Sequence, residues 1–153
     1  MSIHCLRRTQ RLPISPDETW DFISSPVNLK DITPDYMGFI ITSDVPERMY
    51  AGQIITYIVK PILGIPLRWC TEITHVEEGR YFVDEQRFGP YAFWHHQHHI
   101  RPIPGGTEME DIVHYKAPLG PLGELVTPLM VTPKLESIFN YRFEALEKRF
   151  GKF

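Results

Sequence analysis

A polar group of residues lies on the strand-like segment 91–103, where His96 and His98 occupy alternate positions. Alternate side chains of a β-strand point to the same face, so both imidazoles should share one face with Trp94. Asp84 lies in the preceding strand-like segment and Asp111 in the following one. A histidine paired with a carboxylate can act as a general acid or base near neutral pH, and it can also orient a polar group of a ligand.

The turn residues Pro104 and Gly105 predict how the segments 91–103 and 106–116 pair. A tight hairpin here places Trp94 opposite Tyr115, His96 opposite Val113, and His98 opposite Asp111. A slip of two residues would keep the same face but would move His98 from Asp111 to Val113. The predicted inner wall therefore combines aromatic side chains with two histidines and two carboxylates.

Three interpretations of this wall remain open. In the first, the polar groups are structural, because buried polar side chains must form hydrogen bonds. In the second, they orient a hydroxyl, carbonyl or carboxylate of an otherwise apolar ligand. In the third, His96 or His98 is a catalytic acid or base tuned by Asp111 or Asp84.

A metal site is a further alternative, because two histidines at alternate strand positions can bind one ion. Asp111 or Asp84 would supply the third ligand. The run 95–99 lacks the downstream glutamate and histidine spacing of cupin-type sites. We therefore expect no metal and no cofactor.

The elements that position these residues follow from the pattern of the rest of the chain. Ser15-Pro16-Asp17-Glu18 is typical of a helix start. Ser25-Pro26 has the same capping serine followed by proline and predicts a second short helix. From Met37 to Lys116 the sequence has no helical period, and turn residues recur about every ten positions. Together with a first strand at 3–12, we predict strands near 37–43, 52–60, 66–77, 80–88, 91–103 and 106–116.

The C-terminal segment returns to a helical period. Apolar and basic residues recur there at steps of three and four: Leu135, Ile138, Phe139, Arg142, Phe143, Leu146 and Phe150. Thr132-Pro133 could cap this helix, and Pro128 with Pro133 predicts a kinked or broken lead-in. The predicted order is strand, two short helices, six strands and a long helix, which leaves room for a pocket between a twisted sheet and the helix.

Composition restricts the class of protein. The 153 residues, 42% hydrophobic and 23% charged, predict a single domain over 1–153. The net charge of -3 lacks the basic excess of a nucleic-acid binder. The two cysteines favour a reducing compartment, and no apolar run is long enough for a transmembrane helix. We expect a cytoplasmic protein.

These patterns resemble the SRPBCC superfamily, which contains START lipid-binding domains, birch-pollen allergens and polyketide cyclases. The order of elements matches over the whole chain. The motifs that carry the resemblance are Trp69-x-Thr71-x-Ile73, Phe82-x-Asp84-x-Gln86, Gly89-Pro90, Trp94-x-His96-x-His98, Asp111-x-Val113-x-Tyr115, Pro118-x-Gly120 and Phe139-x-Tyr141-Arg142. They are similar to a bacterial ligand-binding branch found fused to sugar-nucleotide-epimerase-like proteins.

The resemblance implies an α+β helix-grip fold, in which a curved antiparallel sheet of about seven strands wraps a long C-terminal helix. It also implies an internal pocket for a lipid-, polyketide- or isoprenoid-like molecule, but no shared catalytic residues. We expect the pocket to be lined by Trp69, Thr71, Phe82, Asp84, Gln86, Trp94, His96, His98, Asp111, Val113, Tyr115 and Phe139.

The leading functional hypothesis is a carrier of a small hydrophobic molecule. The first alternative is a cyclase- or dehydratase-like enzyme whose general acid or base is His96 or His98, with Asp111 as partner. The second is a partner-binding module whose large inward side chains leave no cavity. The apolar segment 62–66 is either a rim of the pocket or a contact with a second copy in a homodimer.

Overall fold

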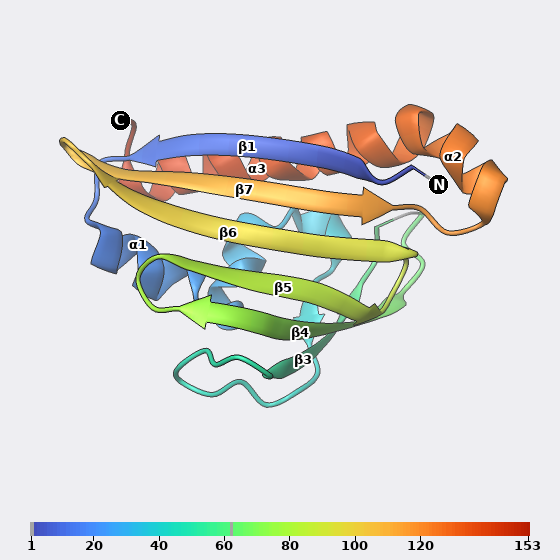
Figure 1. The fold of residues 1–153 in the computed structure, drawn as a ribbon, viewed down its shortest axis with the longest axis horizontal. Coiled ribbons are helices and arrows are strands. Elements are labelled where there is room, and N and C mark those ends of the chain that lie inside the picture. The colour runs from blue at the N-terminus through green and yellow to red at the C-terminus, as the bar shows by residue number, and fades with distance from the viewer. Residues whose placement is uncertain (1, 62) are drawn as a thin grey trace.

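The structure is a computed structural model that describes residues 2–61 and 63–153. A single curved sheet of seven antiparallel strands wraps around a C-terminal helix (Figure 1). The elements in chain order are β1 (His4–Leu12), α1 (Pro16–Ile23), η1 (Pro26–Ile32), η2 (Asp35–Met37), β2 (Ile40–Ile41), β3 (Ile54–Val59), β4 (Leu67–Glu77), β5 (Tyr81–Phe88), β6 (Phe93–Ile103), β7 (Gly106–Lys116), α2 (Gly120–Val126), η3 (Thr127–Val131) and α3 (Thr132–Phe150).

The strand order is β1-β7-β6-β5-β4-β3-β2, so the first strand pairs with the last. The six strands that follow the short helices form a meander of neighbours. The predicted α+β helix-grip architecture is confirmed. Among the described residues, no helix combines the length and the hydropathy that a membrane crossing requires.

The short helices begin as their sequences predict. The Glu18 amide donates to Ser15 Oγ at 3.1 Å, and Pro16 occupies the first turn of α1. The second helix, η1, is a 3-10 helix. The strand predicted at 37–43 was too long, because residues 35–37 form a 3-10 turn that ends at Gly38 in the left-handed conformation, and pairing is limited to β2.

The hairpin between β6 and β7 has the predicted register. Trp94 pairs with Tyr115, His96 with Val113, and His98 with Asp111. The strands alternate faces, so His96, His98 and Asp111 all lie on the inner face and are buried. The tight turn at Gly105, which has a φ of 85°, sets this pairing.

The predicted irregular lead-in to the last helix is a π-helical turn, η3, between α2 and α3. Pro128 and Pro133 lack the amide hydrogens that a regular helix would use there. The prediction that Thr132 caps the helix was wrong, because its hydroxyl lies 2.7 Å from the Tyr115 hydroxyl within a continuous helical segment. The buried residues of α3 are Leu135, Phe139, Arg142 and Leu146, whereas Phe143 is partly exposed.

Candidate functional site

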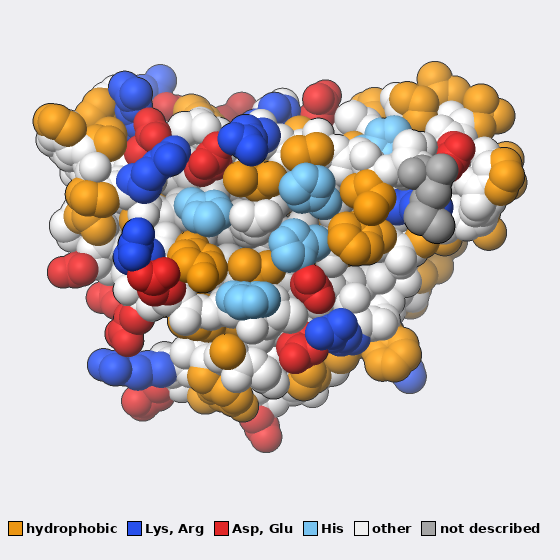
Figure 2. All heavy atoms as spheres, viewed as in Figure 1, with side chains coloured by type: hydrophobic (Ala, Val, Ile, Leu, Met, Phe, Trp, Pro, Cys, Tyr) orange, Lys and Arg blue, Asp and Glu red, His pale blue; other side chains and the backbone are white. Residues whose placement is uncertain are grey.

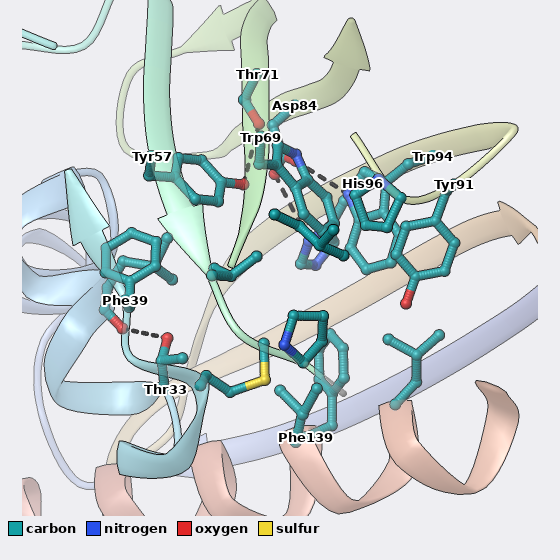
Figure 3. A pocket seen from close by; sticks show the side chains of 18 of the residues that line it. Thr33, Phe39, Tyr57, Trp69, Thr71, Asp84, Tyr91, Trp94, His96 and Phe139 are labelled. Atoms are coloured by element: carbon teal, nitrogen blue, oxygen red, sulfur yellow. Dashed lines mark hydrogen bonds and ion pairs between the residues drawn. The ribbon is translucent and has the colours of Figure 1, made fainter. Parts of the chain in front are cut away.

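A cavity of about 690 Å³ lies between the inner face of the sheet, the η1 segment and the helices α2 to α3. Its wall is mostly apolar and aromatic, and includes Phe39, Tyr57, Trp69, Phe82, Tyr91, Trp94 and Phe139. Figure 3 shows Trp69, Trp94 and His96 on the sheet side and Phe139 on the helix side. The hypothesis of a core without a cavity was therefore wrong.

The polar part of the wall contains two histidines between two aspartates. The imidazole rings of His96 and His98 lie against each other, with centroids 3.7 Å apart. His98 Nε2 lies 2.7 Å from Asp84 Oδ2, and His96 Nε2 lies 2.9 Å from Asp111 Oδ1. The second nitrogen of each ring faces the other carboxylate, at 3.1 Å for His98 Nδ1 and 3.6 Å for His96 Nδ1.

Within the described part of the chain, only one nitrogen of each ring makes a hydrogen bond. His98 Nδ1 is close to Asp111 but out of line for a hydrogen bond, so it is a buried nitrogen without a partner. An ionised carboxylate can only accept, so His96 Nε2 must be the donor to Asp111. In neutral His96 the other nitrogen, Nδ1, then keeps its lone pair.

The surroundings shift the pKa values of the two histidines in opposite directions. Burial and the neighbouring His98 lower the pKa of His96. Burial also acts to lower the pKa of His98, but the adjacent carboxylates of Asp111 and Asp84 outweigh it, and the net pKa is raised. These opposite shifts favour a protonated His98 ring packed against a neutral His96 ring.

Both carboxylates are ionised in this setting. Burial alone would raise the pKa of Asp111, but the positive charge of Arg142, whose Nη2 lies 3.3 Å from Asp111 Oδ1, and the histidines hold it well below its usual range. Burial alone would also raise the pKa of Asp84, but the neighbouring imidazoles of His96 and His98 outweigh this effect and lower it. With protonated His98, two negative and two positive charges balance.

Aromatic rings enclose the histidines. Phe82 stacks on His98 at 4.0 Å between centroids, and Phe139 contacts the His96 ring edge-on at 5.7 Å. Trp94 donates from Nε1 to Asp84 Oδ1 at 3.3 Å. By contrast, the buried Nε1 of Trp69, a second cavity-lining indole, has no hydrogen-bond partner among the described residues. Aromatic rings therefore pack against both histidines, and of the two indoles only Trp94 is hydrogen-bonded to the charged cluster.

Eight of the twelve residues predicted to line the pocket do so. They are Trp69, Thr71, Phe82, Asp84, Trp94, His96, His98 and Phe139. The other four, Gln86, Asp111, Val113 and Tyr115, lie outside the lining. Gln86 instead bonds the backbone of Tyr91 at 2.7 and 3.1 Å, and Asp111 lines a small crevice behind the cavity with Arg142.

The apolar segment 62–66, predicted as a rim or a dimer contact, is described in part. Residue 62 lies outside the described residues. Leu63 lines the cavity, in agreement with a position at its rim. The alternative role in a homodimer stays a prediction.

Three important residues were not placed in the pocket by the sequence pattern. Tyr57 lies on β3 and its hydroxyl is 3.2 Å from Thr71 Oγ1, Tyr91 lies in the loop before β6, and Arg142 projects from α3. The helical stripe marked Arg142 as facing the core, and a buried arginine is a signal for a buried carboxylate partner. Nothing local to Tyr57 or Tyr91 marks them as pocket residues.

The residue types would also suit a metal ion, since Asp84, His96 and His98 offer ligand atoms within 4.8 Å of one another. However, Asp84 is engaged by His98 and Trp94, and His96 by Asp111. Arg142 already supplies positive charge to the cluster. The contacts account for these side chains without a cation, so our expectation of no metal is unchanged.

The opposite face of the sheet carries a second set of histidines. Figure 2 shows this face, with histidine side chains among hydrophobic ones. His95 Nδ1 lies 2.7 Å from Glu85 Oε1, and His99 Nε2 lies 3.0 Å from Gln97 Oε1. These side chains point away from the cavity, as the strand alternation predicted, and take no part in the inner cluster.

No protein-family model matches this sequence, and no curated protein matches it. Solved structures match over nearly the whole chain. The Zhui aromatase/cyclase from Streptomyces sp. R1128 has a TM-score of 0.74 at 12% identity, with 97% of this chain and 93% of that chain covered.

Two further structures have the same arrangement. The protein TTHA0849 from Thermus thermophilus gives a TM-score of 0.70 at 15% identity, covering 96% of this chain and 97% of that chain. The Bet v 1-like protein Ara h 8.0201 gives 0.67 at 13% identity, covering 97% of this chain and 98% of that chain. The chain therefore shares the helix-grip fold of these structures.

Proposed function

We propose that the protein binds a small, largely apolar molecule in the cavity between the sheet and α3. The observation that carries this proposal is an aromatic cavity of about 690 Å³ with a compact polar group in one wall. Burial of apolar ligand surface would contribute roughly 25 cal/mol per Å², before the costs of association. The structural similarity to an aromatase/cyclase and to Ara h 8.0201 supports a fold suited to such a pocket.

The polar atoms specify the kind of ligand. The hydroxyls of Tyr57 and Thr71 lie 3.2 Å apart on the cavity wall and use one hydrogen between them, so the other hydrogen can be donated to a carbonyl or hydroxyl oxygen of a ligand. His96 Nδ1 would accept a hydrogen bond from a ligand hydroxyl. A ligand carboxylate would face the Asp84 carboxylate in a cluster whose charges already balance. We therefore propose a neutral ligand, with a hydroxyl or carbonyl on an apolar body.

The test compares ligands of one size but different polarity. Native mass spectrometry of the purified protein, with analysis of its organic extract, would identify any bound compound. Calorimetric titration with naphthalene, 1-naphthol and 1-naphthoate would then rank the probes. We expect 1-naphthol to bind most tightly and 1-naphthoate most weakly. A purified protein that carries no compound and binds none of the probes would refute the carrier function.

One observation favours a second candidate, an enzyme of the cyclase or dehydratase type. His96 and His98 both line the cavity with ring centroids 3.7 Å apart, and their surroundings lower the pKa of His96 and raise that of His98, so a neutral base would lie beside a protonated acid. Such an enzyme would change the co-purified compound chemically. Incubation of that compound with the wild type and with His96→Gln, followed by mass spectrometry, separates the two functions. Conversion by the wild type alone supports the enzyme, and an unchanged compound supports the carrier.

A further inference from the structure

The mouth of the cavity has an unusual number of exposed apolar side chains. Leu63, in the loop between β3 and β4, is 92% exposed, and Leu119 and Leu129, next to α2, are 73% and 72% exposed. We call this group the apolar rim, and its members are Leu63, Ile65, Leu119, Leu122, Leu125, Leu129 and Met130. Each of them is more than half exposed, which is costly for such large apolar side chains in water.

The apolar rim comes from two segments that meet at the opening of the cavity. The first segment is the β3–β4 loop, and the second, which we call the α2 segment, comprises residues 119–130. The cavity is lined by Leu63 from the loop and by Leu119, Leu122 and Met130 from the α2 segment. Figure 2 shows hydrophobic side chains gathered at the end of the molecule where Figure 1 labels α2. The exposed apolar surface is therefore continuous with the apolar interior of the cavity.

The backbone supports a specific role for two of these leucines. Leu63 has a φ of 50° and Leu119 a φ of 73°, and no other non-glycine residue in the described part of the chain has a positive φ. This conformation is unfavourable for leucine. Both side chains are held in solvent, so packing within the chain does not compensate for the strain. Strained residues of this kind concentrate where a protein binds something else.

Basic residues flank both segments of the apolar rim. Lys60 and Arg68 border the β3–β4 loop, and Lys116 and Lys134 border the α2 segment. Nine of the ten arginines lie within 4.0 Å of a carboxylate; among the described residues Arg68 is the exception. An apolar tip with basic flanks matches the interface of an anionic bilayer, which has hydrocarbon below negative headgroups.

We propose that the apolar rim docks on the surface of a bilayer that contains anionic lipids. The leucines would enter the interfacial region while Lys60, Arg68, Lys116 and Lys134 contact the headgroups. The mouth of the cavity would then face the bilayer, and an apolar ligand would pass between membrane and cavity without crossing water. The docking itself needs no ligand, so it can be tested independently of the carrier function.

The experiment is co-flotation of the purified protein with phosphatidylcholine vesicles, with or without phosphatidylglycerol. We expect binding to the anionic vesicles and little to pure phosphatidylcholine. The variant Leu63→Ser/Leu125→Ser should lower the partition coefficient by roughly tenfold or more, because two large apolar side chains are lost. Its control is Ile54→Ser, an exposed isoleucine at the end of β3 away from the loop.

A second variant pair tests the electrostatic part. Arg68→Gln/Lys116→Gln should weaken binding to anionic vesicles by about fivefold for each cation removed. The control is Lys148→Gln, at the far end of α3, which should bind as the wild type does.

Absence of binding to anionic vesicles, or equal binding by Leu63→Ser/Leu125→Ser and wild type, would overturn the proposal. Light scattering coupled to gel filtration gives the remaining outcome. A dimer that Leu125→Ser converts to a monomer would assign the apolar rim to a second copy of the chain instead.

Discussion

The buried pair of Arg142 and Asp111 holds α3 against the sheet at the level of single residues. Both side chains are almost completely buried, and Arg142 Nη2 lies 3.3 Å from Asp111 Oδ1. Removal of one partner of such a pair leaves an uncompensated charge in the interior. The pair therefore stabilises the geometry of the histidine cluster as well as the fold.

We expect Arg142→Met to lower the free energy of unfolding by about 3 kcal/mol or more, because Asp111 would lose its guanidinium partner. Urea denaturation measures the change. Arg48→Met is the matched control, since Arg48 and Glu78 form a largely exposed pair 3.9 Å apart that should contribute less than about 1 kcal/mol. Equal losses in the two variants would contradict a structural role for the buried pair.

The two inner histidines should titrate on opposite sides of the usual value of 6.5. NMR of the imidazole nitrogens, assigned with His96→Gln and His98→Gln, should place the pKa of His98 above 6.5 and that of His96 below it. His96 in the His98→Gln variant should titrate higher than in the wild type, because a neighbouring positive charge is gone. Two pKa values on the same side would argue against one protonated and one neutral ring.

The same shift predicts how stability depends on pH. Because the folded-state pKa of His98 is raised, the contribution of His98 to the free energy of unfolding is complete below pH 6.5. This contribution is lost as the pH rises through the folded-state pKa. The difference in unfolding free energy between wild type and His98→Gln should therefore shrink as the pH rises from 6.5. A difference that stays constant over this range would show that His98 is not protonated in the folded protein.

At the scale of the elements, the entry to the C-terminal helix depends on a close backbone approach. A Cβ atom on Gly123 would lie 1.9 Å from the carbonyl oxygen of Pro118. Gly123 has a helical conformation, so glycine is required here by space and not by φ. The fit positions α2, and with it Leu122 and Leu125 of the apolar rim, at the mouth of the cavity.

Gly123→Ala should therefore destabilise the protein by about 1–3 kcal/mol, as overpacking does. At an exposed position of a helix, a glycine-to-alanine substitution would instead raise the free energy of unfolding, because alanine is favoured over glycine there by about 1 kcal/mol. Leu125→Ala, at an exposed position in the same helix, is the control and should change stability little. Thermal or chemical unfolding followed by circular dichroism decides the sign.

At the scale of the whole molecule, we expect that the cavity can be partly filled without loss of stability. Ile138 on α3 lines the cavity and is not fully buried. Ile138→Trp should fill part of the space and weaken the binding of 1-naphthol at least tenfold, without loss of unfolding free energy. The control is Glu144→Trp, which adds the same side chain at an exposed position of α3. Unchanged binding in Ile138→Trp would place the ligand elsewhere.

The sequence by itself determined the sheet and the composition of its inner face. Strand alternation is a local property with a period of two, so it placed His96, His98 and Asp111 on one face. The short turn at Gly105 then set their register across β6 and β7. The similarity of motifs to a known superfamily predicted the helix-grip fold, which the structure confirms.

Only the tertiary structure decided which inward residues reach the cavity. Asp111, Val113 and Tyr115 share the predicted face but lie outside the cavity lining; Tyr115 contacts Thr132 and Asp111 contacts Arg142, both on α3. Gln86 is bound to Tyr91 beside a bulge in the pairing of β4 and β5. Where a helix lies on a sheet depends on packing summed over residues distant in sequence, so no local period reveals it.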